Sequence, residues 1–249
     1  MPPGWTPVRT VAADGVRLAG VRCPGAGAGA FVVAHGFTHD TSAPAARRVI
    51  AGLARHGTVV ALDFRGHGRS GGRTSVGRDE TLDLDAAVRL ARGSSPRPVT
   101  VVGFSMGAAV ALRHAAIGDE PGDAVASVSA PSRWYIRHTA PMRRVHWLLE
   151  HPAGPLVGRA LGVRLGRPWP TVPQTPLELM AAIPPRPLLL VHGDADRYFG
   201  PDEAIALHRA AGGAGSLWIE PGMGHAETAT SPSLIERIAT WARAATGGT

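Results

Sequence analysis

A serine between two glycines lies where an apolar stretch of strand length meets a stretch with helical spacing. Residues 103–107 read Gly-Phe-Ser-Met-Gly, with Ser105 at the centre. On a sharp strand-to-helix turn a serine presents its hydroxyl as a nucleophile, and flanking glycines are needed because larger side chains would collide with the adjoining strand and helix. The pattern favours nucleophilic attack on an acyl carbon over the alternative of an incidental serine in a glycine-rich turn.

A nucleophilic serine needs a histidine as its general base, and in proteins with this motif the base follows the serine along the chain. His225 fits best, because it ends the loop Pro-Gly-Met-Gly-His between the last predicted strand and the last predicted helix. The other histidines after Ser105 lie inside predicted helices, in an irregular segment or beside the available acids: His114, His208, His138, His146, His151 and His192.

The histidine in turn needs a carboxylate that fixes its tautomer and stabilises its charged form. Residues 192–196 read His-Gly-Asp-Ala-Asp and follow a predicted strand, so Asp194 and Asp196 are both candidates. Glu220 also ends a strand, but it lies only five residues before His225 on the same loop. The spacing alone does not choose between Asp194 and Asp196.

The elements that must position these side chains alternate along the chain. Apolar runs of strand length occur at 31–35, 58–63, 98–103, 124–130, 187–192 and 216–220. Helical patterns lie near 43–56, 80–92, 106–117, 201–211 and 232–246, and two short strands around Asp14-Gly15 predict an N-terminal hairpin. Alternation of this kind predicts an α/β fold with a mostly parallel central sheet and helices on both faces.

About 55 residues without a clear strand interrupt this alternation after 124–130, which is the sixth predicted strand when the two strands of the hairpin are counted. We predict that residues 131–183 form a cap inserted into a single domain that spans 1–249. Between 131 and 170 seven arginines stand against one acid, Glu150, so this stretch carries +6 of the formal charge of +7. An apolar stripe at Met142, Val145 and Leu149 lies among the arginines. The stripe could close over the site, shape an acyl pocket that favours anions, or dock at an anionic membrane surface.

Several classes of protein and site are not indicated by the composition. Apolar runs fall short of a membrane span, and the first residues lack the pattern of a secretory signal. The single cysteine, Cys23, suits a reducing compartment, so we expect a cytoplasmic protein. Residues 66–71 match G-x-G-x-x-G, but they lead into a polar loop instead of a helix, so no nucleotide cofactor is expected. No spacing typical of a metal site is present.

Five motifs in sequence order resemble the α/β-hydrolase family, most closely its small esterases and lysophospholipase-like members. They are His35-Gly36-Phe37, residues 63–70, residues 103–107, residues 192–201 and Gly224-His225. The likeness covers about 8–130 and 184–247, and the predicted cap resembles no family. In the family the acid stands four residues after the histidine of H-G-x-x-D, which selects Asp196. The resemblance also implies an oxyanion hole formed by the backbone N–H groups of Phe37 and Met106.

The function that these residues imply is hydrolysis of a small-molecule carboxylic ester through an acyl-enzyme on Ser105, with Asp196 and His225, and without metal or cofactor. Family members with an aspartate nucleophile are not indicated, because this chain has a serine. A serine peptidase or thioesterase remains an alternative on the same machinery, and so does a non-catalytic binding protein that retains the fold. No nucleic-acid motif accompanies the basic stretch, and no pattern bears on the oligomeric state.

Overall fold

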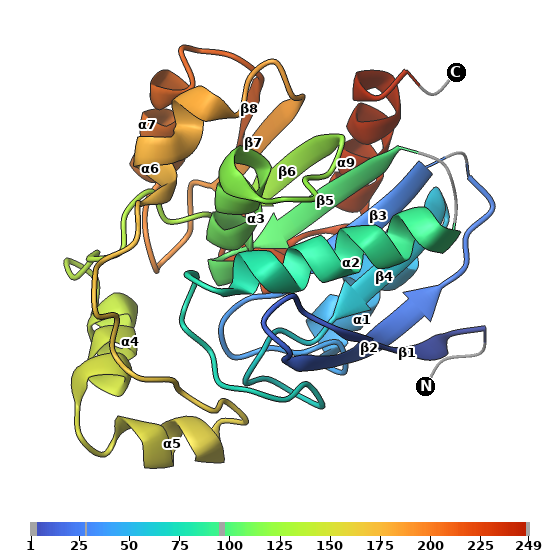
Figure 1. The fold of residues 1–249 in the computed structure, drawn as a ribbon. Coiled ribbons are helices and arrows are strands. Elements are labelled where there is room, and N and C mark those ends of the chain that lie inside the picture. The colour runs from blue at the N-terminus through green and yellow to red at the C-terminus, as the bar shows by residue number, and fades with distance from the viewer. Residues whose placement is uncertain (1–3, 28, 95–97, 248–249) are drawn as a thin grey trace.

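One mixed sheet of eight strands organises the computed structural model, which describes residues 4–27, 29–94 and 98–247 (Figure 1). The strand order is β1-β2-β4-β3-β5-β6-β7-β8. Strands β3 to β8 are parallel to one another, whereas β1 pairs antiparallel with β2 and β2 with β4. The strands are β1 (Thr6–Val11), β2 (Arg17–Cys23), β3 (Gly29–Ala34), β4 (Gly57–Leu62), β5 (Val99–Phe104), β6 (Ala124–Val128), β7 (Leu188–Gly193) and β8 (Ser216–Glu220).

Helices cover both faces of this sheet, as near-continuous apolar strands require. Alternate residues of a strand point to opposite faces, so Val101 of β5 packs in one core and Val102 in the other. Helices α2 and α3 complete the first core, and α1 and α9 complete the second. The helices that pack on the sheet are α1 (Pro44–Leu53), α2 (Glu80–Ser94), α3 (Met106–Ile117), α7 (Asp202–Ala210), α8 (Ala226–Ala229) and α9 (Pro232–Ala245).

The parallel strands bring distant parts of the chain to one edge of the sheet. Ser105 follows β5, Asp196 lies three residues after β7, and His225 lies five residues after β8. Because parallel strands end at the same edge, their carboxyl-terminal loops meet there. Phe37 follows β3, whose neighbours in the sheet are β4 and β5. The topology alone therefore gathers the four predicted site segments.

The predicted α/β class, with a mostly parallel sheet and helices on both faces, is confirmed. Strand β8 and helix α3 begin and end where the sequence predicts, α2 extends two residues beyond its predicted end, and the other predicted central strands and helices are shifted or shortened at their ends. The N-terminal hairpin around Asp14-Gly15 is also present as β1 and β2.

The segment between β6 and β7, predicted as a cap, contains α4 (Ala140–Glu150), α5 (Gly154–Ala160), α6 (Pro176–Leu179) and the 3₁₀ helix η1 (Met180–Ala182). Helices α4 and α5 project away from the sheet (Figure 1). Helix α4 begins after Thr139, whose hydroxyl accepts a hydrogen bond from the Met142 N–H at 3.4 Å. Two isolated β-bridges, His67 with Val163 and Thr74 with Leu165, tie the segment to the loop after β4.

Within the described residues, no helix is both long enough and apolar enough to cross a bilayer. The predicted absence of a secretory signal concerned the first residues of the chain, of which 1–3 lie outside the described part. The predicted single domain likewise includes residues 28, 95–97 and 248–249, which are not described. Its boundaries, and the cap as a unit within it, stay predictions.

Candidate active site

Ser105 occupies a strained turn between β5 and α3. Its φ of 51° and ψ of −116° place a residue with a side chain in a region that costs roughly 1–3 kcal/mol. The two flanking glycines permit the turn: a Cβ on Gly103 would lie 2.4 Å from the Gly107 carbonyl oxygen, and a Cβ on Gly107 would lie 2.3 Å from that of Ala34. The backbone therefore pushes the Ser105 side chain outward, toward the loops that follow β7 and β8.

The structure brings Ser105, His225 and Asp196 into one line of contacts. Nε2 of His225 lies 2.8 Å from Ser105 Oγ, and Nδ1 lies 2.7 Å from Asp196 Oδ2. With a proton on Nδ1 donated to the carboxylate, Nε2 keeps its lone pair and accepts a hydrogen bond from the Ser105 hydroxyl. This arrangement lets the imidazole take the hydroxyl proton when the serine attacks.

Of the two acid candidates, Asp196 contacts the histidine and Asp194 does not. The Asp196 side chain is fully buried, and its second oxygen accepts a hydrogen bond from the Tyr198 N–H at 2.8 Å. Burial is the largest single influence and would raise the pKa of Asp196, but the hydrogen bond from His225, the charge of His225 and the hydrogen bond from Tyr198 together lower the pKa below its usual value, so the carboxylate is charged. Asp194 is exposed and accepts from the Gly222 N–H at 2.6 Å.

Two aromatic rings hold His225 from the sides. Tyr198 stacks on its ring at a centroid distance of 4.2 Å, and Phe199 meets it edge-on at 5.2 Å. Neither residue was singled out from the sequence, although both lie within residues 192–201, which carry part of the family resemblance. The rings restrict rotation of the imidazole and cover part of it from water.

The predicted oxyanion-hole residues lie beside Ser105. Phe37 and Met106 line the same cavity as Ser105, and Met106 is the first residue of α3, where backbone N–H groups have no carbonyl partner within the helix. The Nε2–H of His67 donates to the Phe37 carbonyl oxygen at 2.5 Å, which fixes this peptide segment. Both residues thus lie at the cavity that contains Ser105, and their role as oxyanion donors stays a prediction.

His35 forms a hydrogen bond with the segment that contains Gly36 and Phe37, and its side chain is uncharged. It accepts a hydrogen bond from the Phe64 N–H at 2.9 Å and, through Nδ1, donates to the Gly36 carbonyl oxygen at 2.8 Å. Burial, with a further contribution from nearby His67, lowers the pKa of His35 to about 4. A neutral ring can donate at one nitrogen and accept at the other, as these two contacts require.

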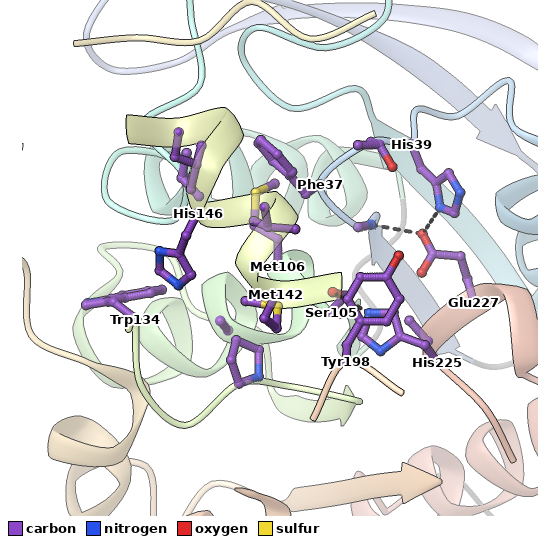
Figure 2. Close-up of a pocket in the computed structure, with 18 of the residues that line it drawn as sticks. Phe37, His39, Ser105, Met106, Trp134, Met142, His146, Tyr198, His225 and Glu227 are labelled. Atoms are coloured by element: carbon purple, nitrogen blue, oxygen red, sulfur yellow. Dashed lines mark hydrogen bonds and ion pairs between the residues drawn. The ribbon is translucent and has the colours of Figure 1, made fainter. Parts of the chain in front are cut away.

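A second carboxylate beside the serine was missed from the sequence. Glu227 is 2% exposed, lines the cavity with Ser105, accepts a hydrogen bond from the Gly36 N–H at 2.9 Å and pairs with Nδ1 of His39 at 2.5 Å (Figure 2). The available signal was its place two residues after His225, together with His39, which lies three residues after Gly36.

The cavity over Ser105 has a volume of about 220 Å³ and two unlike ends. In Figure 2, His225, Tyr198 and Glu227 lie at the Ser105 end, and Trp134 and His146 lie at the other, beyond Met106 and Met142. Besides Ser105 and His225, the polar lining is Thr38, His39, Arg133, His146, Tyr198, Glu227 and Thr228, and the apolar lining includes Val76, Ala109, Pro131, Trp134, Met142, Val145 and Leu149. The predicted stripe Met142, Val145 and Leu149 thus lines the cavity. Among the described residues, no group of three or more His, Cys, Asp or Glu is placed to hold a metal ion.

The fold and these motifs define an α/β hydrolase. The sequence profile of the alpha/beta hydrolase family matches residues 31–236, and the chain belongs to this family. The resemblance inferred from the five motifs is thereby confirmed. No curated protein sequence is significantly similar to the chain.

Solved structures agree with this assignment. The esterase Pf2001 of Pyrococcus furiosus is 25% identical, with a TM-score of 0.76 over 98% of this chain and 93% of that one. The alpha/beta hydrolase GrgF of Penicillium sp. sh18 is 18% identical, with a TM-score of 0.75 over 98% and 99% of the two chains. A serine hydrolase described as lacking a lid, XC6422 of Xanthomonas campestris, is 18% identical, with a TM-score of 0.64 over 98% and 94%. The last two likenesses concern the fold alone.

Proposed function

We propose that the protein hydrolyses carboxylic esters through an acyl-enzyme formed on Ser105. The observation that carries this proposal is the unbroken line of contacts from Ser105 Oγ through the His225 imidazole to the buried carboxylate of Asp196. As Oγ attacks the ester carbonyl carbon, its proton passes to His225 Nε2, and Asp196 stabilises the imidazolium that forms.

The developing negative charge on the carbonyl oxygen is held by the N–H groups of Phe37 and Met106. Such donors are already oriented before reaction, and removal of one from an oxyanion hole costs roughly 3–4 kcal/mol of transition-state stabilisation. The tetrahedral intermediate then collapses, and the imidazolium gives its proton to the departing alcohol oxygen. Water attacks the acyl-enzyme through the same base and releases the carboxylic acid.

The cavity supports an apolar acyl group. The leaving alcohol must lie near His225 Nε2 to receive its proton, so the acyl part extends in the other direction, toward Met106, Met142 and Trp134 (Figure 2). This wall is mainly apolar. Among the arginines of the described 131–183 segment, Arg133 is the one in the cavity lining, and its guanidinium lies 3.5 Å from Glu203. These contacts favour an apolar acyl pocket over a pocket for anions.

The proposal is tested with the Ser105→Ala variant and p-nitrophenyl butyrate. We expect the wild type to release nitrophenolate, and we expect the variant, which lacks the nucleophile, to lose at least about 10³-fold in kcat while it keeps its circular dichroism and unfolding temperature. Activity of the variant close to that of the wild type would contradict the proposal. The same assay with a matched ester, thioester and anilide of butyric acid separates an esterase from a thioesterase or an amide-cleaving enzyme.

A further inference from the structure

Glu227 is a buried acid whose position calls for an explanation. It follows His225 by two residues, and Ala226 between them has a φ of 50°, which a residue with a side chain adopts at a cost. The Ala226 N–H donates to Ser129 Oγ at 3.1 Å and holds this conformation. The strained residue turns both His225 and Glu227 into the lining of the Ser105 cavity.

The carboxylate of Glu227 lies against the segment that carries the oxyanion hole. It accepts a hydrogen bond from the N–H of Gly36, the residue before Phe37. The approach is close: a Cβ on Gly36 would lie 3.1 Å from Glu227 Oε1 and 3.5 Å from Ser105 Cβ. A side chain at Gly36 would therefore contact Ser105 and displace the Glu227 carboxylate by a few tenths of an ångström.

We infer that Glu227 is a positioning residue, whose carboxylate fixes Gly36 so that the Phe37 N–H points at the oxyanion, and whose charge is neutralised by His39. The inference rests on the proposed function, because an oxyanion hole matters only if Ser105 attacks a carbonyl carbon. Glu227 connects the loop that carries His225 to the segment that carries Phe37, so that the general base and the oxyanion donor keep a fixed distance and orientation.

The charge on Glu227 makes the role of His39 necessary. A carboxylate without a counter-charge would repel the negative charge that develops on the oxyanion, and this repulsion is strong where water is excluded. The hydrogen bond to Glu227 raises the pKa of His39 above 6.5, and the pair carries no net charge while His39 is protonated. Burial alone would raise the pKa of Glu227, but the hydrogen bonds from His39 and Gly36 lower it overall, so the acid is ionised.

The other charged groups around the pair do not replace His39. Asp40, next to it in the chain, adds negative charge, and His35 is neutral. Arg48 of α1 donates to the backbone carbonyl of Glu227 at 2.7 Å rather than to its carboxylate, and His225 is engaged with Asp196. Because the pKa of His39 is raised, the ring keeps its proton beyond pH 6.5; once the pH rises through that raised pKa, the carboxylate is left without its counter-charge, and kcat falls.

The experiment measures kcat, KM and pH profiles for p-nitrophenyl butyrate in four variants. For Glu227→Ala we expect a loss of about 100-fold in kcat with KM within about threefold, because one oxyanion donor is misplaced. In Glu227→Gln an amide oxygen still accepts from Gly36 and no charge needs neutralising, so we expect kcat within about fivefold of the wild type and no alkaline decline. For His39→Ala we expect a loss of roughly tenfold in kcat, which Glu227→Gln combined with His39→Ala largely restores.

A boronic acid and a remote acid provide the controls. Phenylboronic acid forms a tetrahedral adduct on a reactive serine, so its affinity should fall in parallel with kcat in Glu227→Ala. Glu236→Ala removes another acid that pairs with a histidine, His56, neither of which lines the cavity, and should leave kcat unchanged.

Three results would overturn the inference: full kcat in Glu227→Ala, equal losses in Glu227→Ala and Glu227→Gln, or no restoration in the double variant. If Glu227→Ala does not fold, the comparison of His39→Ala with the double variant decides. If the wild type hydrolyses no ester, the proposed function fails and this inference fails with it. If the wild type is active and one of the three results is found, only the inference is wrong.

Discussion

The sharpest test of the site replaces one oxygen of Asp196 by an NH₂ group. In Asp196→Asn, the Tyr198 N–H still needs an acceptor, so the amide oxygen remains there and the NH₂ group faces His225 Nδ1. Nδ1 must then accept a hydrogen bond, and the ring proton moves to Nε2. An imidazole protonated at Nε2 cannot take the Ser105 proton.

The size of this effect follows from the burial of Asp196. Its side chain is fully buried, so no water substitutes for the lost charge. The corresponding change in a well-studied serine protease lowers kcat roughly 10⁴-fold, and a similar loss here equals about 5 kcal/mol at 1.36 kcal/mol per factor of ten. The measurement is kcat for p-nitrophenyl butyrate at pH 7.5, with circular dichroism as the check on folding.

Asp194→Asn is the matched control, since it makes the same chemical change two residues away. Asp194 is exposed and holds only the Gly222 N–H among the described residues, so we expect kcat within a few-fold of the wild type. The reasoning would be refuted if Asp196→Asn kept more than a tenth of the wild-type kcat, or if Asp194→Asn were the more damaging change.

Two further predictions concern specificity and stability. Met142→Ala enlarges the apolar end of the cavity, so the ratio of kcat/KM for p-nitrophenyl octanoate over acetate should rise about tenfold; Met180→Ala, an equal truncation in the core beneath the sheet, should leave this ratio unchanged. His35 has a pKa of about 4 in the folded protein against 6.5 in the unfolded chain. The unfolded state therefore binds more protons between these two pH values, and the folded protein loses stability as the pH is lowered through this range. Between pH 7 and pH 5, His35 should account for a loss of about 2 kcal/mol in the free energy of urea unfolding, and His35→Gln should lose correspondingly less; an equal loss in both proteins would contradict this account.

The sequence carried most of the information on the sheet, because buried parallel strands and amphipathic helices leave regular patterns. Helix α3 and strand β8 were predicted to the residue for this reason. Ser105 could be identified because the tight turn that presents it requires glycines only two residues away on either side, and such a local requirement is visible in the sequence. The short helices α5 and α6 could not be predicted, since four to seven residues in a segment rich in proline show no period.

What the sequence could not provide is contact between loops. Glu227 contacts Gly36, which lies 191 residues earlier in the chain. The backbone turn that allows this contact is at Ala226, and because this residue with a positive φ is not a glycine, the sequence gives no sign of the turn. The sequence could not choose between Asp194 and Asp196 for the same reason: both lie on one loop, and the path of the chain decides which of them faces His225. The family pattern selected Asp196, whereas the local spacing could not.

One of the two β-bridges connects the inserted segment to the loop that carries the proposed oxyanion donor Phe37. Val163 is paired with His67, and the imidazole of His67 holds the carbonyl of Phe37. Val163 also belongs to one apolar cluster with Phe37 and Leu149, both of which line the cavity over Ser105. A substitution at Val163 that repacks Leu149 would therefore also be expected to move Phe37, so that a change in the acyl pocket and a change in kcat would occur together.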